Sequence, residues 1–139
     1  MALVYLDTSA LVKLCVDEPG TLLVAALWDG ADVVATSRTA DAEVRATLAA
    51  GGRTGRLDPD AEHRALAAWD RLWPALHVVE VDPALADHAA RLVAAHPLRA
   101  GDALHLASAL ALGSPDLVVA VWDEHLASAC RAEGLRVVP

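Results

Sequence analysis

Two aspartates stand directly after short apolar runs whose composition predicts buried strands. Asp7 follows the run 3–6, and Asp123 follows the run 117–122. In an open α/β sheet the ligand site lies outside the carboxyl ends of the strands. We therefore expect both carboxylates at the same edge of one sheet. Asp32 and Asp116 precede strands, so they are expected at the opposite edge, as solvated acids in turns.

Two further acids are predicted to point toward the edge that carries Asp7. Glu43 lies in the first turns of a helix that follows the second apolar run, and Asp102 opens the helical segment GDALHLASAL. Four carboxylates at one edge cannot all stay ionised unaided, because like charges raise one another's pKa. Divalent cations supply the missing positive charge, and oxygen-only ligands suit Mg²⁺ or Mn²⁺. The sequence therefore predicts an acidic Mg²⁺ or Mn²⁺ site.

The elements that must position these acids alternate along the chain. The apolar runs predict strands at 3–6, 33–36, 78–81, 117–122 and 135–138, with amphipathic helices between them. Such alternation favours parallel pairing with right-handed crossovers. We expect one α/β domain over residues 1–139, with three α/β/α layers around a four- to five-stranded parallel sheet.

Local signals predict where two of the helices begin and end. Thr8 or Ser9 can cap the first helix, since a side-chain hydroxyl accepts a backbone N–H there. Gly51 and Gly52 are expected to stop the helix that carries Glu43, which would leave GGRTGR as a flexible basic loop.

Composition limits the class of protein. The chain is 55% hydrophobic and 22% charged, as is typical of a globular domain, with a net charge of −8. Nucleic acid could therefore be bound only locally, through arginines or bound cations. No apolar run approaches a membrane span and no basic leader is present, so we expect a cytoplasmic protein. Cys15 and Cys130 are expected as reduced core residues.

Four segments in order resemble the motif series of PIN-domain ribonucleases, and within that family the VapC toxins of bacterial toxin–antitoxin pairs. They are YLDTSALVKL near the N-terminus, AEVRATL at 42–48, RAGDALHLASAL at 99–110 and VWDEHLASACRAEGLRVV at 121–138. The resemblance implies a PIN-like fold and an endoribonuclease that hydrolyses RNA phosphodiesters with a metal-activated water. It also implies products with a 5′-phosphate and a 3′-hydroxyl.

The resemblance also implies a set of site residues. The acids that bind metal and carry catalysis would be Asp7, Glu43, Asp102 and Asp123. Glu124 is an alternative to Asp123. Ser9 matches a hydroxyl position of the first motif, and Thr8 is its alternative.

RNA and protein partners follow from the same likeness. Three arginines close to the site motifs are expected to bind RNA: Arg99, Arg45 and Arg38. The resemblance implies a VapB-like antitoxin and a homodimer.

Two other patterns allow two interpretations each. His105 follows Asp102 by three residues, so it is either a packed helix histidine, which is favoured, or a hydrogen-bond partner of a metal-binding carboxylate. Leu66, Trp69 and Trp73 share helical spacing, which favours a core stripe over an exposed groove for an antitoxin segment or a second subunit.

Other functions match the sequence less well. A receiver domain would need a lysine near the late strand ends, but Lys13 is the only lysine. A haloacid-dehalogenase-type phosphatase would need Asp-x-Asp after the first strand, where this chain has Ser9. GGRTGR also lacks the Gly-Lys-Ser/Thr end of a P-loop. The alternative from another class is a non-catalytic PIN-like protein-binding module, which metal titration would distinguish.

Overall fold

The computed structural model describes residues 1–139 and contains one sheet of five parallel strands. The strands lie in the order β3-β2-β1-β4-β5. Their bounds are β1 Leu3–Leu6, β2 Val33–Ser37, β3 His77–Val79, β4 Leu117–Ala120 and β5 Arg136–Val138. The predicted α/β class with a parallel sheet is confirmed. β3 begins one residue earlier and ends two residues earlier than predicted, and β4 ends two residues earlier.

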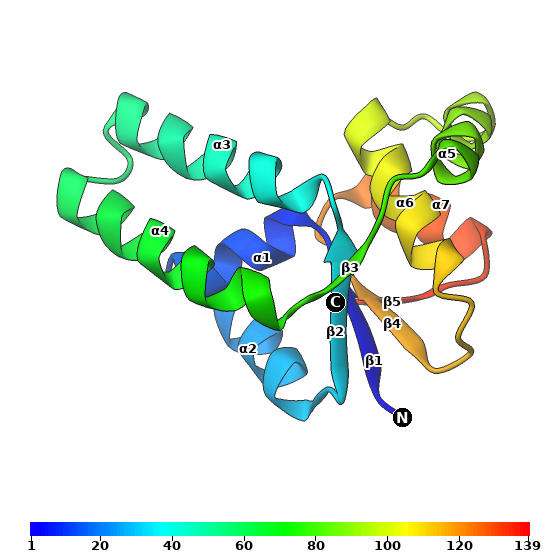
Figure 1. The fold of residues 1–139 in the computed structure, drawn as a ribbon, viewed down its shortest axis with the longest axis horizontal. Coiled ribbons are helices and arrows are strands. Elements are labelled where there is room, and N and C mark those ends of the chain that lie inside the picture. The colour runs from blue at the N-terminus through cyan, green and yellow to red at the C-terminus, as the bar shows by residue number, and fades with distance from the viewer.

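Seven α-helices cover the two faces of this sheet (Figure 1). They are α1 Thr8–Cys15, α2 Thr21–Gly30, α3 Ala40–Thr54, α4 Pro59–Leu72, α5 Pro83–Ala95, α6 Ala100–Ala111 and α7 Glu124–Ala132. Helices α1 to α4 lie on one side of the sheet, and α5 to α7 lie on the other. The predicted three-layer arrangement is therefore present.

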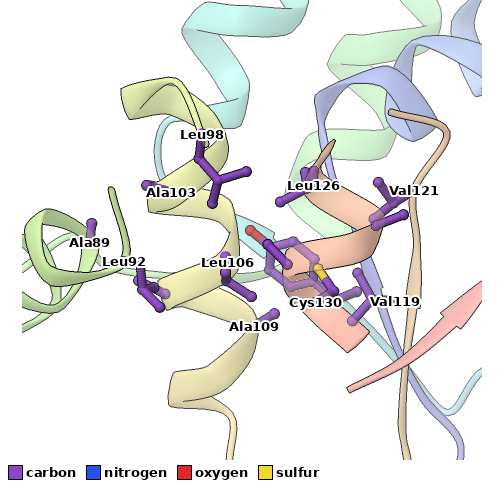
Figure 2. Close-up of a cluster of buried hydrophobic side chains, with 14 of the residues drawn as sticks. Ala89, Leu92, Leu98, Ala103, Leu106, Ala109, Val119, Val121, Leu126 and Cys130 are labelled. Atoms are coloured by element: carbon purple, nitrogen blue, oxygen red, sulfur yellow. The ribbon is translucent and has the colours of Figure 1, made fainter. Parts of the chain in front are cut away.

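The central strand β1 divides the core into two clusters, because successive strand residues point to opposite faces. Leu3 and Tyr5 belong to the cluster beneath α5, α6 and α7, part of which is drawn in Figure 2. Val4 and Leu6 belong to the cluster beneath α1 to α4. All of β1 is buried, as expected for a strand covered by helices on both faces.

The cap of α1 differs from the prediction. Asp7 itself is the N-cap, and its Oδ1 accepts the backbone N–H of Ala10 at 3.0 Å. Thr8 and Ser9, the predicted caps, lie inside the first turn. The reason is the extended backbone of Asp7 (φ −78°, ψ 178°), which places its carboxylate over the free N–H groups of that turn.

Helix α3 does not stop at Gly51 and Gly52 as predicted. It runs to Thr54 and ends at Gly55, whose φ of +79° suits a glycine. The two earlier glycines instead leave room for the following residues. A Cβ at Gly52 would overlap the Glu62 carboxylate of α4, and one at Gly51 would lie 2.9 Å from Leu57 Cδ1.

The apolar stripe of Leu66, Trp69 and Trp73 faces the core, which confirms the favoured interpretation. Trp69 is fully buried, and its Nε1–H donates to Asp41 Oδ1 at 2.8 Å. Leu66 and Trp73 are partly buried against the same cluster. Helix α4 thereby packs on α1 and α3.

Two other expectations concern the acids Asp32 and Asp116, at the sheet edge opposite the cavity, and the two cysteines. Asp32 Oδ2 accepts the backbone N–H of Ala2 at 2.7 Å, and Asp116 lies 3.7 Å from the N-terminal ammonium group. Cys15 and Cys130 are both free. None of the helices combines the length and apolar character needed to cross a bilayer.

Candidate active site

A cavity of about 520 Å³ lies on the side of the molecule where β1 and β4 end. β2 and β3 lie on one side of β1, and β4 and β5 lie on the other, so the β1–β4 boundary is a topological switch point, where α/β sheets bind ligands. Residues of α1, α3 and α6 line the cavity, together with the segment after α1, the turn after α3 and the residue before α7. All four predicted acids line it: Asp7, Glu43, Asp102 and Asp123.

Asp7 is the most buried of these acids, with 5% of its surface exposed. Its Oδ1 accepts the backbone N–H of Ala10 and the hydroxyl of Ser9 at 2.9 Å. Burial raises the pKa of Asp7 and outweighs these hydrogen bonds, which act in the opposite direction. The negative charge of Asp102 adds to the rise. The protein therefore does not fully stabilise the negative charge of the ionised Asp7 carboxylate.

Glu43 is held from two sides. Its Oε1 lies 2.9 Å from His105 Nε2 and accepts the Thr39 hydroxyl at 2.9 Å. Burial raises the pKa of Glu43, but the hydrogen bond and charge of His105, with help from Thr39 and Thr8, lower it overall. Glu43 is thus kept ionised by its protein partners.

Asp102 and Asp123 complete the acidic wall. Burial raises the pKa of Asp102, and the charge of Asp123 raises it further, while Arg99 and His105 act in the opposite direction. Asp123 is the N-cap of α7, where its Oδ1 accepts the backbone N–H of Leu126 at 2.9 Å. Glu124 is exposed in the first turn of α7 and does not line the cavity.

The carboxylates share a pattern of hydrogen bonding. In Asp7, Glu43 and Asp123 one oxygen is held by protein donors and the other accepts none, and Asp102 accepts none with either oxygen. The unbonded oxygens, the oxygen-only donor set and the mutual repulsion all suit a hard divalent cation.

No group of three Asp, Glu, His or Cys side chains is close enough to form a ready-made metal cage. Mg²⁺ usually keeps several waters and is held by only one or two carboxylates plus substrate phosphate. The site therefore fits a hydrated ion better than a closed coordination shell.

His105 is both packed and engaged with an acid. It is 3% exposed, which agrees with the favoured prediction, and its Nε2 also contacts Glu43, one of the carboxylates predicted to bind metal. Its Nε2 also lies 3.0 Å from Thr8 Oγ1, and its Nδ1 lies 2.7 Å from the Tyr5 hydroxyl. The predicted hydroxyls thus differ: Ser9 donates to Asp7, whereas Thr8 contacts His105.

The predicted arginines separate into two groups. Arg99 lines the cavity, and so does Arg56, which the sequence placed only on a basic loop. Arg38 and Arg45 do not line it. Arg38 pairs with Glu80, and its guanidinium lies over the ring of Trp73. Arg45 pairs with Asp41 and Asp70 on α3 and α4.

Two contributors to the site could not be identified from the sequence. Tyr5 lies in an apolar strand, and nothing in its neighbours indicates a polar partner 100 residues away. Gly101 lies directly before Asp102, and a Cβ there would be 3.2 Å from Glu43 Oε2. The DAL-H spacing of α6 was the only available signal for His105.

Comparison with known proteins adds family information to this geometry. The sequence model of the PIN domain matches residues 4–138. Ribonuclease VapC45 of Mycobacterium tuberculosis is 49% identical over 139 residues, which is 100% of this chain and 96% of that protein.

Solved structures show the same fold. The crystal structure of Mycobacterium tuberculosis VapC20, described as a sarcin-ricin loop cleaving toxin, aligns with a TM-score of 0.70 at 20% identity, over 95% of each chain. A member of the VapBC family of toxin–antitoxin systems, VapBC-5 of Mycobacterium tuberculosis, aligns with a TM-score of 0.65 at 22% identity. That alignment covers 99% of this chain and 98% of the other.

Proposed function

This chain belongs to the PIN-domain family and is of the VapC type, and from this membership we propose that it is an endoribonuclease toxin of a toxin–antitoxin pair. One observation carries the proposal. Four acids from separate segments of the chain line one cavity at the switch point of the sheet. The 49% identity to a ribonuclease over the whole chain supports the same activity.

We propose Mg²⁺ or Mn²⁺ as the cofactor, held by Asp7, Glu43, Asp102 and Asp123. When bound, such an ion would lower the pKa of a water molecule, so that the water loses a proton more easily and can attack phosphorus. It would also offset charge on the leaving oxygen. Asp7 is fixed at the end of β1 by Ser9 and Ala10, so one of its oxygens keeps a constant position. Glu43, kept ionised by His105 and Thr39, would accept a hydrogen bond from the attacking water and orient it.

The arginines of the cavity would bind the RNA backbone. Arg99 is at the N-cap of α6, next to Asp102, and its side chain makes no capping hydrogen bond. Phosphate contacts of this kind position RNA, and specificity comes from bases in single-stranded or looped segments. Arg56 offers a second cation in the same cavity. Arg38 and Arg45 would contact RNA only where the strand extends beyond the cavity.

A VapB-like antitoxin is the proposed protein partner, and a homodimer is the proposed assembly. The fold shared with a VapBC toxin–antitoxin protein supports the antitoxin. The toxin role is separable from the chemistry, because a nuclease of this fold could act without an antitoxin.

The activity is tested by incubating the purified protein with transfer, ribosomal and messenger RNAs in the presence of Mg²⁺ or Mn²⁺. Cleavage is expected to stop with excess EDTA and to return when Mn²⁺ is restored in excess. Cleavage that persists in EDTA would contradict the proposed cofactor. Absence of cleavage of every RNA, together with absence of Mn²⁺ binding by calorimetry, would favour the non-catalytic module.

Adjacent acids provide a matched test of the fourth ligand. Asp123→Asn is expected to weaken Mn²⁺ binding about tenfold or more, since losses of 10- to 100-fold accompany even outer contacts of metal sites. Asn keeps the cap on α7, because Asn and Asp are comparable N-caps. Glu124→Gln removes the same charge from an exposed residue outside the cavity and should leave the affinity within about twofold of wild type. Calorimetric titration measures both, and a reversed order would assign the role to Glu124.

A further inference from the structure

A buried chain of hydrogen bonds connects the central strand to one acid of the cavity. The Tyr5 hydroxyl on β1 lies 2.7 Å from His105 Nδ1 on α6. On the other side of the ring, His105 Nε2 lies 2.9 Å from Glu43 Oε1 on α3. Tyr5 and His105 are 1% and 3% exposed, so water cannot replace these contacts without opening the core.

The direction of the hydrogen bonds follows from the chemistry of the two partners. The ionised Glu43 carboxylate can only accept a hydrogen bond, so the ring proton shared with it belongs to Nε2. Nδ1 of the neutral ring then accepts, and the Tyr5 hydroxyl is its donor. The Nε2–H group then points toward Glu43 Oε1. In this way the partner of one ring nitrogen determines what the other nitrogen does.

The ring is also fixed in place. Tyr5 meets it edge-on, with centroids 5.9 Å apart and planes at 75°. Thr8 on α1 contacts Nε2 at 3.0 Å. His105 therefore joins β1, α1, α3 and α6 at a single point. Glu43 reaches the cavity from the long helix α3. Its partner His105 is fixed because it is bonded in turn to Tyr5 of the sheet.

We propose that Tyr5 and His105 act together as positioning residues that hold Glu43 in the orientation used at the cavity. Tyr5 acts through His105, and His105 acts through Glu43, so neither needs to touch RNA or metal. The proposal rests on the proposed function, in that it assumes a role for Glu43 in binding the cation and orienting water. It adds two residues outside the acidic set: Tyr5 belongs to the core cluster, and His105 lines the cavity from α6.

Tyr5→Phe is the most specific test, because it removes one hydroxyl and keeps the buried ring. We expect Mn²⁺ affinity and kcat each to fall about tenfold, at the lower end of the losses seen for outer contacts of metal sites. KM for RNA should stay unchanged, since Tyr5 does not line the cavity. In a Glu43→Ala background, which has no acceptor for His105, Tyr5→Phe should cause no further loss of Mn²⁺ affinity, because its only route to the site is gone. Equal losses in both backgrounds would overturn the proposal.

A second comparison separates positioning from general damage. His105→Ala should lose about 10- to 100-fold in both readouts, and His105→Gln should recover part of the loss because its amide can donate to Glu43. The control is His96→Asn, which alters the other His–Glu contact of the chain, between His96 and Glu133 at 3.5 Å. His96 does not line the cavity, so His96→Asn should match wild type. Equal losses for His105→Gln and His105→Ala would count against positioning.

The unliganded protein offers a readout that does not depend on nuclease activity. In ¹⁵N spectra of the histidine ring, His105 is expected to carry its proton on Nε2, and Tyr5→Phe should change this pattern. A proton on Nδ1 in the wild type would overturn the inferred relay. If Glu43→Gln and Asp102→Asn leave cleavage intact, the proposed function fails. If they abolish cleavage while Tyr5→Phe has no effect, only the positioning role fails.

Discussion

Asp102→Asn is expected to abolish RNA cleavage in a protein that stays folded and melts at the same or a higher temperature. Asn keeps the size of the side chain but loses the charge and one acceptor oxygen. Because Asp102 accepts no protein hydrogen bond, the structure loses no internal contact. Metal assistance supplies several kcal/mol of transition-state stabilisation, so the rate should fall by roughly 1000-fold.

The expected change in stability has a definite sign. Burial and the charge of Asp123 raise the pKa of Asp102 in the folded state above its unfolded value. A carboxyl shifted in this direction destabilises the fold at a pH where it is ionised, and the effect disappears as the pH falls and the group is protonated. Asn carries no charge and removes this cost at neutral pH. Loss of activity with unchanged or raised Tm would separate a functional acid from a structural one.

The control for this variant is an acid far from the cavity. Asp87→Asn removes one negative charge from an exposed residue of α5 and should preserve both cleavage and Tm. Gel-based cleavage assays and thermal unfolding without metal measure the two readouts. Metal-dependent cleavage that survives Asp102→Asn would mean that another site or a contaminating nuclease is responsible.

Trp69→Ala is expected to destabilise the protein by about 3–5 kcal/mol, the usual cost of truncating a buried aromatic residue to Ala. Trp69 is fully buried, and its ring lies 5.5 Å from that of Trp73. Its removal would leave a cavity between α4 and the helices beneath it and would take the Nε1–H donor from Asp41. Such a loss is a large part of the 5–15 kcal/mol that stabilises a typical domain. Urea unfolding gives the free energy directly.

Two variants calibrate this result. Trp69→Phe keeps most of the ring and loses the hydrogen bond, so it should cost clearly less than Trp69→Ala. Leu22→Ala removes a large side chain that is 86% exposed, and it should change the free energy of unfolding by no more than about 0.5 kcal/mol. A cost below 1 kcal/mol for Trp69→Ala would contradict the assignment of this residue to the core.

The sequence predicted the sheet and the place of the acids because both follow from strong local patterns. Apolar runs of three to five residues between helices indicate buried parallel strands, and residues just past their ends must meet at one edge. Asp7 and Asp123 needed no more than this rule. Glu43 and Asp102 lie on helices, where distance to the sheet depends on packing. Their places near the starts of those helices predicted the same edge, and the family resemblance implied the same two residues.

The errors came from side chains and glycines whose role depends on distant neighbours. Gly51 and Gly52 usually indicate a helix end, but here they give room to Leu57 and Glu62. The sequence analysis gave Asp7 only a role in the acidic site, although the same carboxylate also caps α1. The link between Tyr5 and His105 spans 100 residues and follows no local pattern.

The position of β1 between β2 and β4 has a consequence for how the protein is made. The first strand to leave the ribosome is the centre of the sheet, and one of its two neighbours is synthesised only when residues 117–120 appear. Contacts so distant along the chain form late, because a long loop must close first. A nascent or truncated chain that ends before β4 therefore lacks Asp123 and the switch point, so translation has nearly finished before a destructive activity can be assembled.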